Sequence, residues 1–502
     1  MENSASYQSQ QVKSGVYPLN VAKAVQWMLL LIIAYFPFQK RFSSALKGIS
    51  YSFVPSHVEL PSFFSKKMDF YFTDLIILLM IGLCLYRGRK RVGAFLFSGP
   101  AKFLILFFAA AVLSVACSVT ADYAIQYYRL VQLLLFLLLF CSISDVLRSL
   151  EVQQLVNRIF WVFLFAALVE CGIGIAQYFM QGSLGLKSLG EVNISGFHFP
   201  MQGGYRWIID EWTGCMTDRT VLCRCSGTFT HPNILGGFLF ASLLATFYLI
   251  IVENKKTVRR LLYGAIFIQI FTLAISFSRA AIIATVIGVF VWFGVSMVKF
   301  FRKEKRNDLF FLRRVSVIAA VLVSALICLS LFYNQFFSRG GIINYNQVVA
   351  VADQERIVYQ NIAWEMFKDH PILGGGYNNY QILSHEYIPE NNTSVLFAKV
   401  HNIYLLVLAE TGLLGAGAFV LFLISLFKRL LRRADDEAIQ TALAIFAGFL
   451  FIGLCDFYFL HTHHGKCLFF LFAALLQADL KTFKRPEPFV EQISQPVGSK
   501  LD

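Results

Sequence analysis

The chain has 502 residues, of which 57% are hydrophobic and only 15% are charged. A water-soluble domain carries about 25% charged residues, so this composition excludes a soluble globular protein and predicts an integral membrane protein. The net charge of +14 does not indicate nucleic-acid binding if the basic residues gather in alternate loops between membrane helices.

Twelve apolar runs are long enough, or nearly so, to cross a bilayer, which takes about 20 helical residues each. In chain order they lie at 20–38, 69–86, 101–118, 124–143, 156–179, 234–252, 260–277, 279–299, 315–333, 402–427, 437–459 and 466–480. The sequence therefore predicts an all-α, polytopic integral membrane protein with about 12 transmembrane helices.

Basic residues are concentrated in the loops that follow alternate runs. These loops lie at 87–91 ("RGRKR"), 253–260 ("ENKKTVRR"), 299–314 and 427–433 ("FKRLLRR"). The positive-inside rule predicts that they face the cytoplasm, together with both termini. The segment 38–68, which carries five basic residues on the other side, is a partial exception.

Two of the predicted outer loops are long, at 180–233 and 334–401. Long structured loops on one face are typical of a place for chemistry or recognition. We therefore divide the chain into four parts: an N-terminal tail over 1–19, helices one to five with the first long loop over 20–233, the remaining helices with the second long loop over 234–480, and a C-terminal tail over 481–502.

The second long loop contains a predicted amphipathic helix before the tenth apolar run. In "ADQERIVYQNIAWEMFKDHPILGGGY" (352–377) apolar residues recur at helical spacing until Pro371 and the glycines after it end the pattern. The apolar positions are Ile357, Val358, Ile362, Met366 and Phe367. Such a helix is suited to lie on the membrane surface, with Arg356 at its edge.

Ionisable residues occur inside or at the ends of the predicted membrane helices, where they are costly and point to function. The predicted topology places most of them in the outer half of the bilayer: Asp74, Arg129, Arg279, His401 and Asp456. A transporter would instead place polar groups near the midplane between internal repeats, and the sequence shows no such repeat. For Arg129 and Asp74 an ion pair between two helices is the alternative interpretation.

His401 and Asn402 open the tenth apolar run. A histidine at that place can be a simple helix-start residue, but the long loop and the outer arginines favour a catalytic role. Aromatic residues able to stack on sugars accompany it, although an interfacial belt is the other explanation for them: Trp207, Trp212, Trp364, Tyr377 and Tyr380.

Glu410 lies nine residues after His401, which places it on the opposite face of a helix. It cannot orient that histidine, so we predict a packing role for it. Gly412, Gly415 and Gly417 are expected to let another helix approach closely.

The segment "HNIYLLVLAETGLLG" fits the pattern H-[NSQ]-x9-G-x-x-G, with His401, Asn402, Gly412 and Gly415 at the fixed positions. It resembles the signature of bacterial O-antigen ligases and the related polysaccharide polymerases. Three further segments resemble the same superfamily in the same order and spacing: "GTFTHPNILGGFL" (227–239), "SFSRAA" (276–281) and "ERIVYQNIAWEMFKDHPILGGGYNNY" (355–380). The resemblance covers about 220–425.

This resemblance implies a GT-C-like glycosyltransferase in the bacterial cytoplasmic (inner) membrane. Such an enzyme moves a glycan from undecaprenyl diphosphate to an acceptor hydroxyl at the outer, periplasmic face. His401 would be the base that takes the hydroxyl proton, and direct displacement would invert the anomeric carbon. Neither a catalytic metal nor a cofactor is expected.

Guanidinium groups suit the donor's pyrophosphate because they form bidentate hydrogen bonds to it. Arg279 and Arg356 are our first choices for this role, followed by Arg129 and Arg224. Two further residues are candidates for substrate contact: Asn402, which could orient the histidine or a sugar, and His231, which could instead cap the sixth helix.

The cluster "HTHHGK" holds His461, His463 and His464 in what the sequence predicts to be a short exposed loop without an acidic partner. It could take up an adventitious metal, but it does not indicate a catalytic one. The first long outer loop, at 180–233, holds Cys215, Cys223 and Cys225, where one disulfide could form.

Two alternatives remain beside the ligase interpretation. A polymerase of O-antigen, capsule or exopolysaccharide shares the motifs and differs in its acceptor, which would be another lipid-linked repeat instead of lipid A core. A transporter or flippase of lipid-linked sugars predicts that function survives replacement of His401 by alanine. All three interpretations involve a lipid-linked glycan and membrane lipids, and none involves nucleic acid.

Overall fold

The computed structural model describes residues 19–39, 41–45, 67–97, 99–118, 123–148, 152–193, 198–200, 221–301, 308–339, 347–388, 399–430 and 436–477. Most of both predicted terminal tails lies outside these ranges, as do Trp207, Trp212 and Cys215. The possible disulfide of Cys215 therefore stays a prediction.

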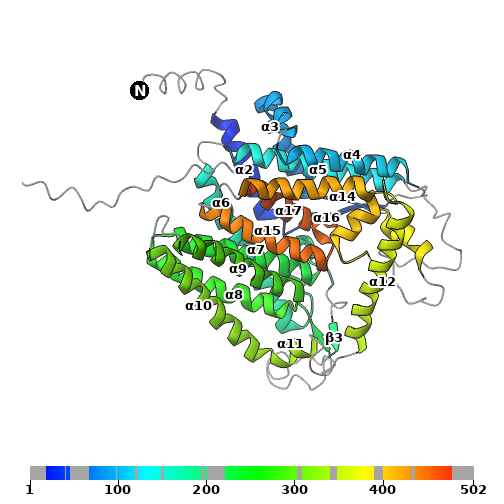
Figure 1. The fold of residues 1–502 in the computed structure, drawn as a ribbon. Coiled ribbons are helices and arrows are strands. Elements are labelled where there is room, and N and C mark those ends of the chain that lie inside the picture. Colours follow the sequence, from blue (N-terminus) through cyan, green and yellow to red (C-terminus); the bar gives the residue numbers. More distant parts are fainter. Residues whose placement is uncertain are drawn as a thin grey trace, which may run out of the picture.

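Helices form most of the regular structure in these ranges (Figure 1). The long ones are α2 (Leu19–Tyr35), α3 (Phe72–Leu96), α4 (Ala101–Ala116), α5 (Tyr123–Val146), α6 (Val152–Met180), α7 (Pro232–Val252), α8 (Lys256–Ile275), α9 (Arg279–Phe301), α10 (Asp308–Leu331), α12 (Gln347–Asp369), α14 (Ile403–Leu430), α15 (Glu437–Cys455) and α17 (His463–Leu475). The short ones are α11 (Tyr333–Arg339), α13 (Tyr380–Leu383), α16 (Tyr458–His461) and the 3-10 turns η2 (Lys187–Leu189) and η4 (Ser384–Tyr387). Each of the twelve predicted apolar runs falls on one of the long helices.

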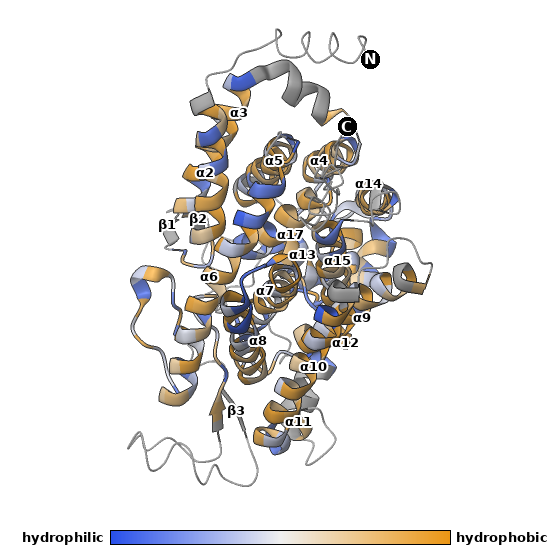
Figure 2. Ribbon diagram, turned by 90° about the vertical axis from the view of Figure 1, so that its left-hand side faces the viewer, coloured by the Kyte–Doolittle hydropathy of each residue, from blue (hydrophilic) through white to orange (hydrophobic). Residues whose placement is uncertain are grey.

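Eight helices in the described part of the chain are long and apolar enough to cross a membrane: α5, α6, α7, α8, α9, α10, α14 and α15. Hydrophobic residues dominate nearly every helix of the bundle (Figure 2). The prediction of an all-α polytopic membrane protein is confirmed, whereas the count of twelve spans stays a prediction. In the described residues α2 and α4 are shorter apolar helices.

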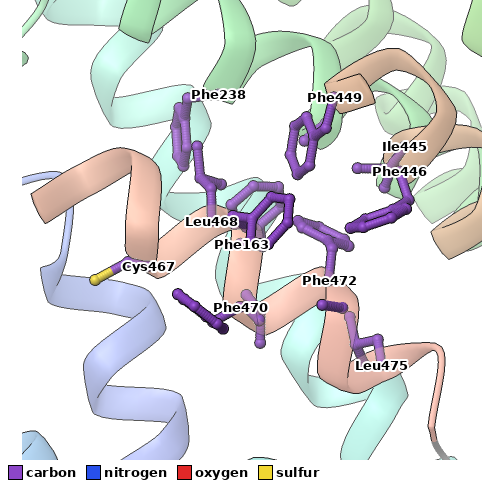
Figure 3. Packing of buried hydrophobic residues seen from close by; sticks show 14 of the residues in the cluster. Phe163, Phe238, Ile445, Phe446, Phe449, Cys467, Leu468, Phe470, Phe472 and Leu475 are labelled. Atoms are coloured by element: carbon purple, nitrogen blue, oxygen red, sulfur yellow. The ribbon is translucent and has the colours of Figure 1, made fainter. Parts of the chain in front are cut away.

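The centre of the bundle is built around α7 and α17, whose residues are almost all buried (Figure 3). Phe472 of α17 packs against Phe163 of α6 and Phe449 of α15, with ring centroids 5.6 and 5.7 Å apart. α17 has 13 residues. At 1.5 Å per residue such a helix is about 20 Å long, which is less than the roughly 30 Å of bilayer core.

The segment "HTHHGK" is not an exposed loop, and this prediction is wrong. α16 and α17 fold back into the bundle, so that the side chain of His463 is buried. Its Nε2 atom lies 2.7 Å from the Asp74 carboxylate, which comes from a helix 389 residues earlier in the sequence. His461 pairs in the same way with Glu410. The acidic partners could not be recognised in the sequence because they lie far from the histidines along the chain.

The predicted amphipathic helix is confirmed as α12, which ends just before Pro371. Its Ile362 and Met366 side chains are buried in a small core against α14. Ile357 and Trp364 lie on the opposite face, where their exposed fractions are 59% and 47%. The helix therefore has one apolar side toward the bundle and a second apolar side turned away from it.

The chain after α12 packs into a break in α14. Gly412 adopts φ 61° and ψ −165°, a conformation open almost only to glycine. The Gly375 amide donates to the Ala409 carbonyl at 2.9 Å, and the Leu413 amide donates to the Pro371 carbonyl at 2.8 Å. A backbone loop thus approaches Gly412, where the sequence suggested another helix.

Several helix ends meet at one end of the bundle. Because α7, α8 and α9 are joined by short turns, the start of α7 lies beside the start of α9. A Cβ atom placed on Gly236 in α7 would come within 2.9 Å of the Ala281 Cβ in α9. The start of α14 lies beside the end of α15, where the Tyr404 hydroxyl donates to the Leu450 carbonyl at 2.9 Å.

Two small antiparallel sheets close the connections between helices. β1 (Arg41–Ala45) pairs with β2 (Lys67–Tyr71), and β3 (His198–Pro200) pairs with β4 (Val221–Cys223). The sequence analysis predicted neither of them. The second sheet leads directly into the chain that enters α7.

We predict that Gly412→Ala lowers the free energy of unfolding by about 1–3 kcal/mol, because a Cβ there would overlap the Ile372 carbonyl in a strained backbone conformation. Gly417→Ala in the same helix is the control, since nothing lies within 4 Å of its Cβ. Thermal unfolding of both purified variants in detergent measures the difference. Equal midpoints would contradict this account of the break.

Candidate active site

His401 lies just before the first residue of α14. Its Nδ1 atom is 3.6 Å from Oδ1 of Asp456, the residue that follows α15. The histidine side chain is 24% exposed, whereas the aspartate side chain is only 6% exposed. A substrate can therefore reach the imidazole of this pair but not its carboxylate.

Two hydrogen bonds fix the Asp456 carboxylate from the other directions. The Asn233 side-chain amide donates to Oδ2 at 2.8 Å, and the backbone amide of Phe457 donates to Oδ1 at 2.8 Å. Burial alone raises the pKa of Asp456. The interaction with the His401 imidazole and the other polar neighbours outweighs burial and brings this pKa to about 2. Asp456 is thus an anion throughout the physiological pH range.

Arg224 supports this arrangement from behind. Its NH2 group donates to Oδ1 of Asn233 at 2.8 Å, and its Nε donates to the Ser276 carbonyl at 2.9 Å. The same NH2 group lies 3.5 Å from the carbonyl of Phe277, which has the unusual positive φ of 49°. Arg224 therefore clamps the start of α7 to the strained turn between α8 and α9.

Arg279 and Arg356 lie near Cys455, the residue before Asp456. Arg279 is the first residue of α9, Arg356 belongs to α12, and both are partly exposed. Both guanidinium groups and Asp456 interact electrostatically with Cys455, the last residue of α15. The structure thus brings the two first-choice arginines to the end of α15, next to the residue that faces His401.

His231 and Asn402 each cap a helix of the site. The Nδ1 atom of His231 accepts from the Asn233 amide at 3.1 Å and so caps α7, which was the alternative to substrate contact for this residue. His231 also lies close enough to Asp456 to act on its charge. The Asn402 side-chain oxygen accepts from the Tyr404 amide at 2.9 Å, which caps α14 and fixes the chain beside His401.

Residues 264–420 match the family described as O-Antigen ligase. The match covers less than half of the chain and supports a likeness of this region to the O-antigen ligase superfamily. No curated protein matches the chain. The matched region contains Arg279, Arg356 and His401.

The O-antigen ligase match does not reach the residues that support this site from α7 and α15. Asp456 and Asn233 lie outside it, as does Arg224. Sequence reasoning placed Asp456 at the same end of the bundle as His401 but did not pair them. One signal in the sequence could have suggested the pair: Asp456 follows an apolar run on the side where His401 begins another.

Arg129 lies in a different cluster of side chains. Its NH1 group donates to Oε1 of Gln132 at 2.8 Å, and its guanidinium carbon lies 5.3 Å from the ring centre of Tyr128. Asp74, its suggested partner, binds His463 instead. The structure therefore separates Arg129 from the arginines near His401.

Proposed function

We propose that this protein transfers a glycan from undecaprenyl diphosphate to an acceptor hydroxyl, as an O-antigen ligase does. The observation that carries the proposal is the partly exposed His401 imidazole beside the buried, ionised Asp456, with Arg279 and Arg356 near the adjacent Cys455. This combination supplies a base and cations at one place.

In this mechanism Asp456 orients the base. Because Nδ1 of His401 faces the carboxylate, the proton belongs on Nδ1 and the lone pair on Nε2. Nε2 then takes the proton of the acceptor hydroxyl as that oxygen attacks the anomeric carbon. Asp456 stabilises the imidazolium that forms, so it is a positioning residue and His401 is the catalytic one.

Arg279 and Arg356 stabilise the leaving group. The bond between the anomeric carbon and the phosphate oxygen breaks on the side opposite the attack, which inverts the sugar. Its electrons remain on the lipid pyrophosphate. Two guanidinium groups can hydrogen-bond these oxygens and become more favourable as the charge develops. Arg224 contributes indirectly by holding Asn233.

The proposed reaction takes place at the outer face of the cytoplasmic membrane. The basic segments of the sequence follow the ends of α7, α9 and α14, and these ends lie opposite the starts of the same helices. The positive-inside rule favours the cytoplasm for these segments. His401 then faces the periplasm, where a flipped lipid-linked glycan and its acceptor meet.

We predict that His401→Ala reduces transfer by about 10²–10⁴-fold, the usual contribution of a general base. The assay combines purified full-length protein with an undecaprenyl-diphosphate-linked glycan and, in separate reactions, lipid A core or a second lipid-linked glycan. Transfer only to the core identifies a ligase, and transfer only to the second glycan identifies a polymerase. His370→Ala, at the end of α12, is the control and should retain activity. Unchanged transfer by His401→Ala would remove the catalytic assignment, whereas absence of transfer by the wild-type protein would favour a transporter.

We also predict that a reporter fused after residue 395, just before the site, signals from outside the cytosol. A second fusion within the basic connection 253–260 should signal from the cytosol, because lysine and arginine retain that side. Activity of both fusions in the cytosol would place His401 on the wrong face for an extracytoplasmic lipid-linked donor.

A further inference from the structure

Three basic residues from three parts of the chain gather in the interior beside the proposed active site. We call Arg129 of α5, Lys399 before α14 and Lys466 of α17 the basic cluster. Oε1 of Gln132 accepts from Arg129 at 2.8 Å and lies 3.4 Å from the Lys466 ammonium. Lys399 is close enough to act electrostatically on Lys466. The proposed reaction uses neither Lys466 nor Lys399.

Lys399 is held in a defined geometry. Its ammonium donates to Oδ1 of Asn378 at 2.9 Å and lies 2.6 Å from Nδ1 of His461. Because an ammonium can only donate, the His461 ring carries its proton on Nε2, which points to the Glu410 carboxylate at 3.8 Å. Burial and the charge of Arg129 lower the pKa of Lys399 to about 7, although Glu410 opposes this shift.

The carboxylates near the basic cluster are engaged by other groups. Asp74 accepts from the Tyr71 amide at 3.0 Å and pairs with His463. Glu410 accepts from the Tyr380 amide at 3.4 Å and pairs with His461. Within the described residues none of these contacts is a direct ion pair to the basic cluster.

The basic cluster consequently has N–H donors without an acceptor among the described residues. Lys466 is only 2% exposed, and its contacts are the long hydrogen bond to Gln132 and the ring of Phe136 at 5.7 Å. The Nε atom of Arg129 is buried without a hydrogen-bond partner in the described part of the chain. Within the described ranges, three basic groups face only two carboxylates, Asp74 and Glu410. Buried charge of one sign is costly unless a counter-charge occupies the place.

The loop that carries Asn378 has a strained backbone beside the basic cluster. Asn378 has φ of 60°, which is uncommon for a residue other than glycine. The same loop fixes Glu410 through the Tyr380 amide. Strain of this kind is kept where the surrounding structure requires it, often at ligand sites.

One aromatic ring separates the basic cluster from His401. The ring centre of Phe457 lies 5.2 Å from that of His401 and 6.1 Å from that of His461. Arg129 and Lys399 are both partly exposed. The basic cluster therefore lies within one aromatic ring of His401.

We propose that Arg129, Lys399 and Lys466 form a second anion-binding subsite, which receives an acidic substituent of the glycan. A carboxylate on the sugar and a phosphate on the sugar share the required chemistry. The proposal rests on the proposed function, because it takes the glycan at His401 as the source of the acid. It makes the enzyme selective for acidic over neutral saccharides.

The test measures binding to the purified full-length protein in nanodiscs, with glucuronate, glucose 1-phosphate and neutral glucose as probes. Wild-type protein should bind either acid more tightly than glucose, and the tighter of the two acids identifies the substituent. Lys399→Gln and Arg129→Gln should weaken acid binding about tenfold or more, the worth of one charged hydrogen bond. Lys399→Arg keeps the charge and should retain binding, which excludes a mere folding defect.

Arg279→Gln is the matched control, because it removes a cation from the other anion site. Acid binding should stay within about twofold of wild type in this variant, whereas inorganic pyrophosphate binding should fall about tenfold. Equal binding of acid and glucose overturns the proposal. Loss of pyrophosphate binding in Lys399→Gln but not in Arg279→Gln also overturns it, since the cluster would then hold the donor's diphosphate. These outcomes need no catalysis, so they are independent of whether His401→Ala retains transfer.

Discussion

The carboxylate of Asp456 joins three helices at one end of the bundle. It meets His401 at the start of α14, Asn233 at the start of α7 and the backbone that leaves α15. A buried anion must be compensated by donors and positive charge, or it would take up a proton. The residues around Asp456 are therefore constrained together, and the proposed base lies beside the carboxylate that these hydrogen bonds hold.

The region beyond this carboxylate is organised by interruptions of regular helix. α14 breaks at Gly412, where the loop after α12 packs against it, and α15 is followed by α16 and α17. These interruptions bring backbone amides and polar side chains to depths where straight helices would present only apolar groups. Irregular backbone at such depth is tolerated where protein buries it or where it lines a polar site. The two polar centres on either side of Phe457 depend on this arrangement.

The helices could be predicted from the sequence because each needs about 20 apolar residues. The grouping of Arg279, Arg356 and His401 could also be predicted, since Arg279 and His401 open predicted membrane helices and Arg356 lies in the long loop on the same side of the expected topology. The pairing of His401 with Asp456 could not, because the two residues are 55 positions apart and nothing local joins them. The burial of His463 was missed for the same reason, as its acidic partner comes from a distant helix.

The central claim is that Asp456 acts through His401. A double-mutant cycle on purified protein tests it directly, with kcat/KM for glycan transfer measured for wild type, His401→Ala, Asp456→Asn and the double variant. If the carboxylate serves the imidazole, the double variant loses no more activity than His401→Ala alone. If the two losses add to within about 0.5 kcal/mol, the residues act independently and the account is contradicted.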